Sequence, residues 1–249
     1  MKKFFLSLII ISSLSYVQAQ EKKDLSLSEM TEIWDTEVPV VTPGQTLMDV
    51  PSDAIVLFGG ENLNDEWTSL EGGPPDWKVT DNCLTVVSGA GNIKTIRNFN
   101  DFQLHIEWRT PSEVVGESQS RGNSGIFLQG LYEVQILDNF NNRTYSNGQA
   151  GSIYKQYTPL VNACKGPGEW QVYDIFYTAP RFTSDGKYFT QPYVTVIQNG
   201  ILVQNHVAVR GPTTYELPEY NIKFHGAAPI ILQDHGCPVN FRNIWIREL

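Results

Sequence analysis

VTVIQNGILVQNHV, residues 194–207, sets two runs of β-branched and apolar residues on either side of Asn199-Gly200. A two-residue hairpin turn needs positive φ at both central positions, and Asn-Gly adopts that conformation at low cost. The stretch therefore predicts a β-hairpin. Other short runs of the same kind, bounded by Gly, Asn, Asp or Pro, follow one another from Ala54 to the C-terminus and predict further strands.

The run FQLHIEWRT, residues 102–110, alternates between apolar and polar side chains. Leu104, Ile106 and Trp108 fall on one side, as expected of a strand with one buried face. No long helical periodicity is visible. Many short strands at this spacing favour an all-β sandwich or barrel, and the length suits two antiparallel sheets of six or seven strands.

The N-terminal part of the chain differs from the rest. Residues 1–20, MKKFFLSLIIISSLSYVQAQ, have the basic, apolar and small-residue order of a cleavable secretory signal, with the cut near Ala19 or Gln20. We therefore expect an exported protein, periplasmic or extracellular, without a membrane anchor. Residues 21–53 read as an N-terminal extension with one short helix at Leu27 to Asp35, and residues 54–249 as a single domain.

Charge and cysteine content limit the possible functions. A formal net charge of -9 argues against nucleic acid, whose binding depends on Lys and Arg. Cys83, Cys164 and Cys237 allow at most one disulfide, and buried free thiols are an equal alternative. No CxxC or HExxH motif is present, so no strong metal motif exists.

The stretch YEVQILD, residues 132–138, contains the first candidates for chemistry. Glu133 and Gln135 share a strand face, and a bulge after Gln135 would bring Asp138 to the same side. Laminarinase-type glucanases place three acids on such a strand, but Gln135 replaces the middle one. The alternative is an ordinary strand with a solvated face.

Other candidates lie in separate segments. The glycine-rich stretch RGNSG offers Arg121 and Asn123, whose alternative is a turn between strands. Near the C-terminus, Gln233 and His235 share one face of a predicted strand, and imidazole suits proton transfer near neutral pH. The remaining candidates are Tyr154, Lys155 and Trp170 in a long loop, Glu107 and His105 at a possible rim, and His225.

Seven stretches in order carry a family resemblance from about Ile55 to Leu249: LFGGENLNDEW, WKVTDNCLTV, FQLHIEWRTP, RGNSGIFLQGLYEVQILD, LVNACKGPGEWQVYDIFYTAPRF, VTVIQNGILVQNHV and PIILQDHGCPVNFRNIWIRE. They resemble the 3-keto-disaccharide hydrolase family. The resemblance implies a two-sheet antiparallel jelly-roll sandwich of the concanavalin A-like type. It also implies cleavage of 3-keto-glycosides by C2 proton abstraction, elimination and hydration.

That chemistry needs a base near C2, a donor for the enolate oxygen and an acid for the leaving oxygen. We assign the base to Glu133 or His235 and the acid to Asp138 or Lys155. Arg121, Asn123 and Gln233 are expected to be donors, with Gln135 as a further binding residue; Tyr154 and Trp170 would stack on sugar.

The cofactor and partner expectations complete this reading. No cofactor is expected, although Glu133, Asp138 and His235 could bind a divalent metal. An upstream sugar 3-dehydrogenase would supply the ketone. The alternatives are a non-catalytic carbohydrate-binding module and a two-carboxylate glycosidase.

Overall fold

The computed structural model describes residues 27, 30, 38–216 and 220–249. The predicted signal, residues 1–20, and most of the predicted helix Leu27 to Asp35 lie outside the described residues. The chain divides into two units between residues 40 and 41, and residues 41–249 carry all the strands discussed below. In the described part of the chain, no helix is long and apolar enough to cross a membrane.

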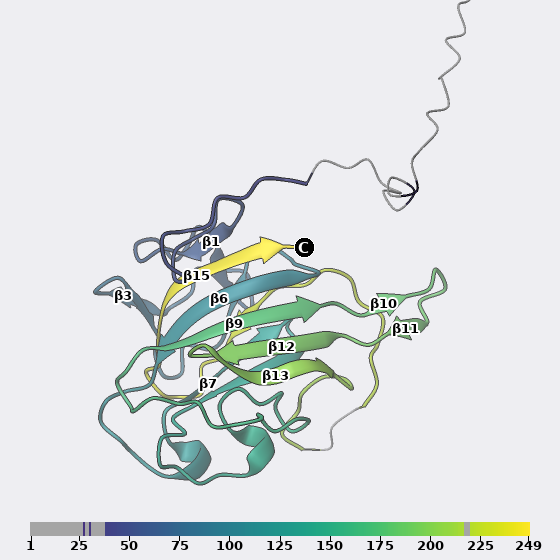
Figure 1. Cartoon of the computed structure of the whole chain (residues 1–249). Helices are drawn as coiled ribbons and strands as arrows, with labels where there is room; N and C mark the ends of the chain where they lie inside the picture. The colour runs from purple at the N-terminus through teal and green to yellow at the C-terminus, as the bar shows by residue number, and fades with distance from the viewer. Residues whose placement is uncertain (1–26, 28–29, 31–37, 217–219) are drawn as a thin grey trace, which may run out of the picture. The chain divides into compact units, whose positions relative to one another are not determined.

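The larger of two main sheets has eight antiparallel strands (Figure 1). Their order is β13 (Ile201–Ala208), β12 (Tyr193–Gln198), β9 (Gln171–Thr178), β6 (Phe102–Arg109), β15 (Asn240–Glu248), β4 (Cys83–Thr85) and β3 (Lys78–Thr80), with β1 (Ile55–Phe58) also paired to β15. Asn199 and Gly200 have φ of 52° and 79° between β12 and β13, so the predicted Asn-Gly hairpin is confirmed.

The smaller sheet has five antiparallel strands. Their order is β2 (Trp67–Ser69), β5 (Ile93–Thr95), β14 (Ile231–Leu232), β7 (Asn123–Leu128) and β8 (Tyr132–Leu137). The remaining elements are the hairpin of β10 (Arg181–Phe182) and β11 (Tyr188–Thr190) and the short 3-10 helices η2 (Ser118–Ser120) and η3 (Ser146–Gly148). The antiparallel sandwich is confirmed, but the sheets are unequal because the short strands β1, β3 and β4 all join the larger one.

The core lies between the two sheets. Leu104, Ile106 and Trp108 of β6 are at most 1% exposed and face it, as the alternation predicts. From the smaller sheet, Val134 and Ile136 of β8 enter the same core. The three cysteines are free, so the free-thiol alternative holds in this structure.

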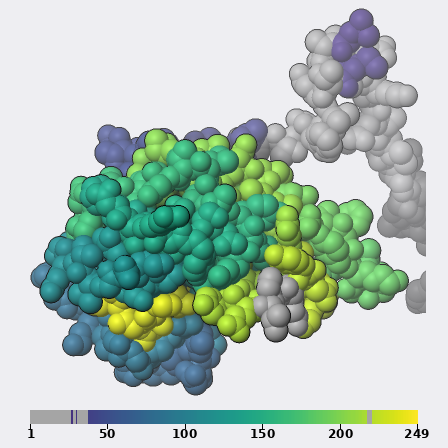
Figure 2. All heavy atoms as spheres, turned by 90° about the horizontal axis from the view of Figure 1, so that it is seen from below, coloured from purple at the N-terminus to yellow at the C-terminus, as the bar shows by residue number. Residues whose placement is uncertain are grey.

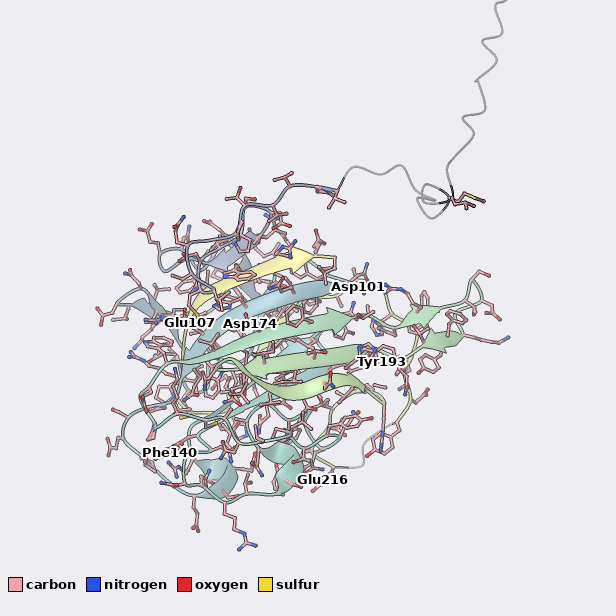
Figure 3. All side chains as sticks on the ribbon, in the orientation of Figure 1. Asp101, Glu107, Phe140, Asp174, Tyr193 and Glu216 are labelled. Atoms are coloured by element: carbon pink, nitrogen blue, oxygen red, sulfur yellow. The ribbon has the colours of Figure 1, made fainter. Side chains whose placement is uncertain are left out.

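A charged network lies on the opposite face of β6. His105 is fully buried, stacks on Trp245 and bonds Asp174 through Nδ1 at 2.7 Å. Figure 3 shows Asp174 and Glu107 on neighbouring strands of the larger sheet. Glu107 accepts hydrogen bonds from Arg242 at 2.6 Å and from Asn243 at 2.9 Å.

These contacts shift two pKa values. Burial opposes the charged form of His105, but the hydrogen bonds with Asp174 and Glu107 outweigh it and raise the His105 pKa above its usual value. Burial also disfavours the Glu107 carboxylate, yet its bonds with His105, Asn243 and Arg242 lower the Glu107 pKa to about 2. Both shifts favour the charged forms of these two side chains.

Replacing Asp174 with Asn should reduce stability in a pH-dependent way. Because the folded-state pKa of His105 is raised, its stabilisation is complete below pH 6.5 and is lost as pH rises through that pKa. We expect Asp174→Asn to lower the free energy of unfolding by about 1–3 kcal/mol at pH 6 and by less at pH 9.

Urea denaturation of the wild type and the variant at both pH values measures this difference. The matched control is Asp76→Asn, since Asp76 is exposed. A loss that is the same at pH 6 and pH 9 would show that the imidazolium does not contribute to stability.

Candidate functional site

Three adjacent strands of the smaller sheet form the floor of the site. Strand β7 pairs with β14 on one side and with β8 on the other. Since alternate residues of β8 enter the core, Glu133 and Gln135 face outward. Asn123 of β7 and Gln233 after β14 line the same cavity as these two residues. The floor thus collects polar side chains from three segments far apart in sequence.

The register of β7 and β8 makes room for Glu133. Their hairpin turns at Gln129 and Gly130, with φ of 49° and 68°, and pairs Gly125 with Gln135. A Cβ atom on Gly125 would clash with Oε1 of Glu133. Glycine at position 125 therefore lets the carboxylate lie flat across the neighbouring strand.

Two connected hollows lie over this floor. The inner cavity has a volume of about 220 Å³ and the outer cavity about 840 Å³. The inner one is lined by Gln119, Asn123, Phe127, Glu133, Gln135, Tyr154, Thr213, Tyr215, Gln233 and His235. Four of these residues, Gln119, Tyr154, Tyr215 and His235, also line the outer one and so mark the junction.

Loops from the middle of the chain enclose the site. Residues 111–122 supply much of the outer lining, together with Tyr145, Tyr154 and residues 235–238. Figure 2 shows this face from below, where teal and green loops from the middle of the chain lie beside yellow C-terminal residues. Binding residues on loops held by a rigid sheet are a common arrangement.

Glu133 is the one carboxylate that lines the inner cavity in the described part of the chain. It is 4% exposed, and burial raises its pKa to about 8. Among the described residues, none donates a hydrogen bond to its carboxylate or pairs with it. A carboxyl group in such a setting holds its proton near neutral pH and is a strong base once deprotonated.

Three amide oxygens beside Glu133 are buried without a partner in the described residues: Oδ1 of Asn123, Oε1 of Gln135 and Oε1 of Gln233. Nδ2 of Asn123 donates to the Gln119 carbonyl at 2.9 Å, and this contact orients the amide so that Oδ1 of Asn123 points away from Gln119. Nε2 of Gln135 donates to Oε1 of Gln119 at 3.0 Å. Buried acceptors left open in this way suit the hydroxyl groups of a ligand.

Asp138 does not join Glu133. Strand β8 keeps an unbroken register with β7 from Tyr132 to Leu137, so the predicted bulge is wrong. Asp138 instead forms an ion pair with Arg121 and accepts a hydrogen bond from the backbone of Phe140. Asp138 lines neither cavity, whereas Arg121 lines the outer one. The carboxylate of Asp138 positions Arg121 and is not free for proton transfer.

Three further predicted residues lie away from the cavities. Glu107 belongs to the network on the larger sheet. Trp170 lies under the guanidinium of Arg242, 4.0 Å from the ring centroid, on that same side. His225 bonds the hydroxyl of Tyr132 at 2.9 Å. Sequence alternation places Glu107 on a polar strand face, but it does not say which sheet presents that face.

Gln233, His235 and Tyr154 do line the inner cavity, as expected of one site. Lys155 lines neither cavity, and its Nζ lies 3.8 Å from the ring centroid of Tyr145. Sequence reasoning missed Gln119, Tyr145, Thr213 and Tyr215. Their segments lack strand periodicity, so only the amide of Gln119 and the aromatic rings of Tyr145 and Tyr215 could have singled them out, and Thr213 carries no such signal.

In the described residues, no group of three His, Cys, Asp or Glu side chains is placed to hold a metal ion. Glu133 and His235 share the cavity, but Asp138 is engaged by Arg121. The metal triad considered from sequence is therefore not assembled.

An antiparallel sandwich with a polar cavity on one sheet is an architecture suited to carbohydrates. The chain belongs to the 3-keto-alpha-glucoside-1,2-lyase-like domain family, whose model matches residues 53–247. This confirms the family resemblance. Membership makes the protein a carbohydrate-active, glycosyl hydrolase-like protein. A comparison with curated proteins finds no match.

Solved structures agree with this assignment. A candidate glycosyl hydrolase from Parabacteroides distasonis ATCC 8503 is 57% identical, with a TM-score of 0.83, over 89% of this chain and 96% of that one. A second candidate glycosyl hydrolase from the same organism is 24% identical, with a TM-score of 0.56, over 79% of this chain and 99% of that one. The second shares the fold alone.

The buried carboxyl of Glu133 should reduce stability. Its folded-state pKa is raised, so the unfolded chain releases this proton first and the free energy of unfolding falls as pH rises from about 4.5 to about 8. Glu133→Gln removes this effect. We expect the variant to be more stable than the wild type at pH 8, by on the order of 2 kcal/mol, and similar at pH 4.

Urea denaturation at the two pH values tests the expectation. Glu113→Gln is the matched control, because Glu113 lines the outer cavity and is exposed. Equal stability of wild type and Glu133→Gln at pH 8 would contradict the raised pKa.

Proposed function

We propose that the protein cleaves the glycosidic bond of 3-keto-glycosides, with Glu133 as the base that removes the C2 proton. The observation that carries the proposal is the unpaired, buried carboxyl of Glu133 on the floor of the inner cavity, beside three open amide oxygens. Membership in the 3-keto-alpha-glucoside-1,2-lyase-like family supports the same substrate class.

A ketone at C3 makes the C2 proton acidic, since the resulting carbanion delocalises into the carbonyl as an enolate. Removal of this proton allows the group at C1 to leave, and addition of water then gives the free 3-keto sugar. Once a bound sugar displaces water from the cavity, a buried base is effective because no water competes for its lone pairs. Burial of Glu133 provides this setting.

The amide side chains fit the other polar positions of the sugar. Open oxygens on Asn123 and Gln135 accept hydrogen bonds from hydroxyl groups. Gln233 keeps an amide NH₂ that donates to no other described residue, so it suits the enolate oxygen. The inner cavity has about the volume that seven water molecules occupy in the liquid, which suits one sugar ring.

A two-carboxylate glycosidase fits less well. Such enzymes place two carboxyl groups on opposite sides of the bond that breaks, roughly 5–9.5 Å apart. In the described residues the inner cavity presents Glu133 alone, and Asp138 is engaged by Arg121. Elimination from a keto sugar needs one carboxylate base, which matches this arrangement.

Export and an upstream partner complete the proposal. Residues 1–20 resemble a secretory signal, so we place the reaction in the periplasm or outside the cell. The ketone has to come from an oxidation at C3, which points to a sugar 3-dehydrogenase acting before this protein.

The test uses a 3-keto-glucoside and its unoxidised parent, in both anomers. We expect release of the aglycone from the keto form alone. The value of kcat/KM should rise with pH through about 8, because Glu133 acts as a base only after it loses its proton. Glu133→Gln should lower kcat/KM at least about 100-fold without unfolding the protein.

His235→Ala is the second variant, since His235 is exposed at the junction and its loss should weaken the reaction less than Glu133→Gln. Cleavage of the parent would identify a plain glycosidase, and binding without turnover would identify a binding module. Full activity of Glu133→Gln would show that a residue other than Glu133 is the base.

A further inference from the structure

We propose that Tyr154 is the general acid that protonates the leaving oxygen, with Tyr145 and Lys155 stabilising its phenolate. This inference rests on the proposed function and adds a catalytic role to a residue that sequence analysis treated as a stacking platform. It also replaces Asp138 and Lys155 as the acid.

The backbone holds Tyr154 next to the proposed base. Residues 151–154 run along the free edge of β8, where the backbone N–H of Gln135 donates to Ser152 at 3.0 Å. The N–H of Tyr154 donates to the carbonyl of Glu133 at 3.1 Å. The base and the acid are therefore fixed to each other through adjacent main-chain hydrogen bonds.

The position of Tyr154 matches that of the leaving oxygen. Glu133 and the open amides line the inner cavity alone, so the keto ring lies there. The C1 oxygen then lies where the inner and outer cavities meet, and the leaving group extends into the outer one. Tyr154 lines both cavities and reaches this junction.

The other junction residues are less suited to the role. Both groups of the Gln119 amide are engaged, since Nε2 donates to Thr144 at 2.8 Å and Oε1 accepts from Gln135. Tyr215 is 66% exposed. His235 is exposed, and no hydrogen bond to another described residue orients its ring. A side chain that is exposed and without an orienting contact is held less firmly against the leaving oxygen, and positioning is what general acid catalysis requires.

The phenol of Tyr154 has partners that stabilise its conjugate base. Its hydroxyl lies 2.6 Å from the hydroxyl of Tyr145, which can donate to a phenolate. The ammonium of Lys155 lies 3.8, 4.8 and 5.8 Å from the ring centroids of Tyr145, Tyr215 and Tyr154. Within the described chain this ammonium has no carboxylate partner, so its charge is directed at the tyrosines.

The resting phenol keeps its proton. Burial raises the pKa of Tyr154 above that of free tyrosine, and the resting hydrogen bond, in which Tyr154 donates to Tyr145, adds to this effect. After proton transfer the Tyr145 hydroxyl can turn and donate to the phenolate. An alkoxide leaving group is itself a strong base. A donor with a high pKa therefore transfers its proton to the alkoxide late, when the C1–O bond is already breaking.

The atoms and charges balance over one cycle. Glu133 takes the C2 proton, the C1–O bond breaks, a C1=C2 double bond forms, and Tyr154 gives its proton to the departing oxygen. Water then adds at C1 and yields a proton to the Tyr154 phenolate, while Glu133 returns a proton to C2. Both residues end in their starting states, and the net change is hydrolysis.

The experiment compares two leaving groups in Tyr154→Phe. 4-Nitrophenolate is a weak base and can leave without gaining a proton. Methoxide is a strong base and needs a proton from an acid as it leaves. We expect kcat/KM for the methyl 3-keto-glucoside to fall about 100-fold or more, and that for the 4-nitrophenyl compound to fall less than about threefold. Tyr157→Phe is the matched control, since the Tyr157 hydroxyl bonds Ala208 and lines neither cavity.

Two more readouts separate this inference from the proposed function. Deuterium exchange at C2 of 3-keto-1,5-anhydroglucitol, which has no exocyclic leaving group at C1, should be lost in Glu133→Gln and kept in Tyr154→Phe. Lys155→Met should lower kcat/KM for the methyl compound more than kcat/KM for the 4-nitrophenyl compound. If Tyr154→Phe lowers kcat/KM equally for both compounds, or if it loses deuterium exchange at C2, the acid role of Tyr154 alone is overturned. A wild type that neither cleaves nor exchanges would overturn the proposed function as well.

Discussion

The pairing register of β7 and β8 is the constraint on which the site depends. It sets Gly125 opposite Gln135 and leaves the carboxyl of Glu133 over the glycine. A shift by one residue would turn Glu133 into the core and Val134 toward the cavity, because strand side chains alternate. The hairpin turn at Gln129 and Gly130 and the β14 strand on the other side hold that register.

The same register creates a polar floor that is costly for the folded state. Glu133 and three amide oxygens are buried without partners in the described residues, and such groups destabilise a fold unless a ligand satisfies them. The ordered core between the two sheets offsets this cost. His105, Glu107 and Asp174 on the larger sheet show the contrast, since each of those charged groups has a partner. Around Glu133, three unsatisfied amide oxygens thus lie in one cavity, and such local departures from full hydrogen bonding are common at functional sites.

Sequence pattern predicted the parts of the structure that local rules control. The Asn199-Gly200 turn and the alternation of Leu104, Ile106 and Trp108 follow from backbone geometry and from one buried face, so they appear as expected. Asp138 and Glu107 could not be placed in this way. Whether Asp138 meets Glu133 or Arg121 depends on how a loop packs after β8 ends, and whether Glu107 meets the cavity depends on which sheet contains β6. Both are properties of tertiary packing.

The unequal cavities impose an order on the proposed reaction. Glu133 and Tyr154 return to their starting states only when water reaches C1, and the leaving group occupies that approach first. Water therefore enters after the aglycone has moved out through the larger outer cavity, while the inner cavity retains the eliminated ring. In the proposed reaction the amides of Asn123, Gln135 and Gln233 would keep their contacts with the ring throughout, since they line the inner cavity alone. Elimination and hydration thus share one set of residues because the ring stays in place while the occupant of the outer cavity changes.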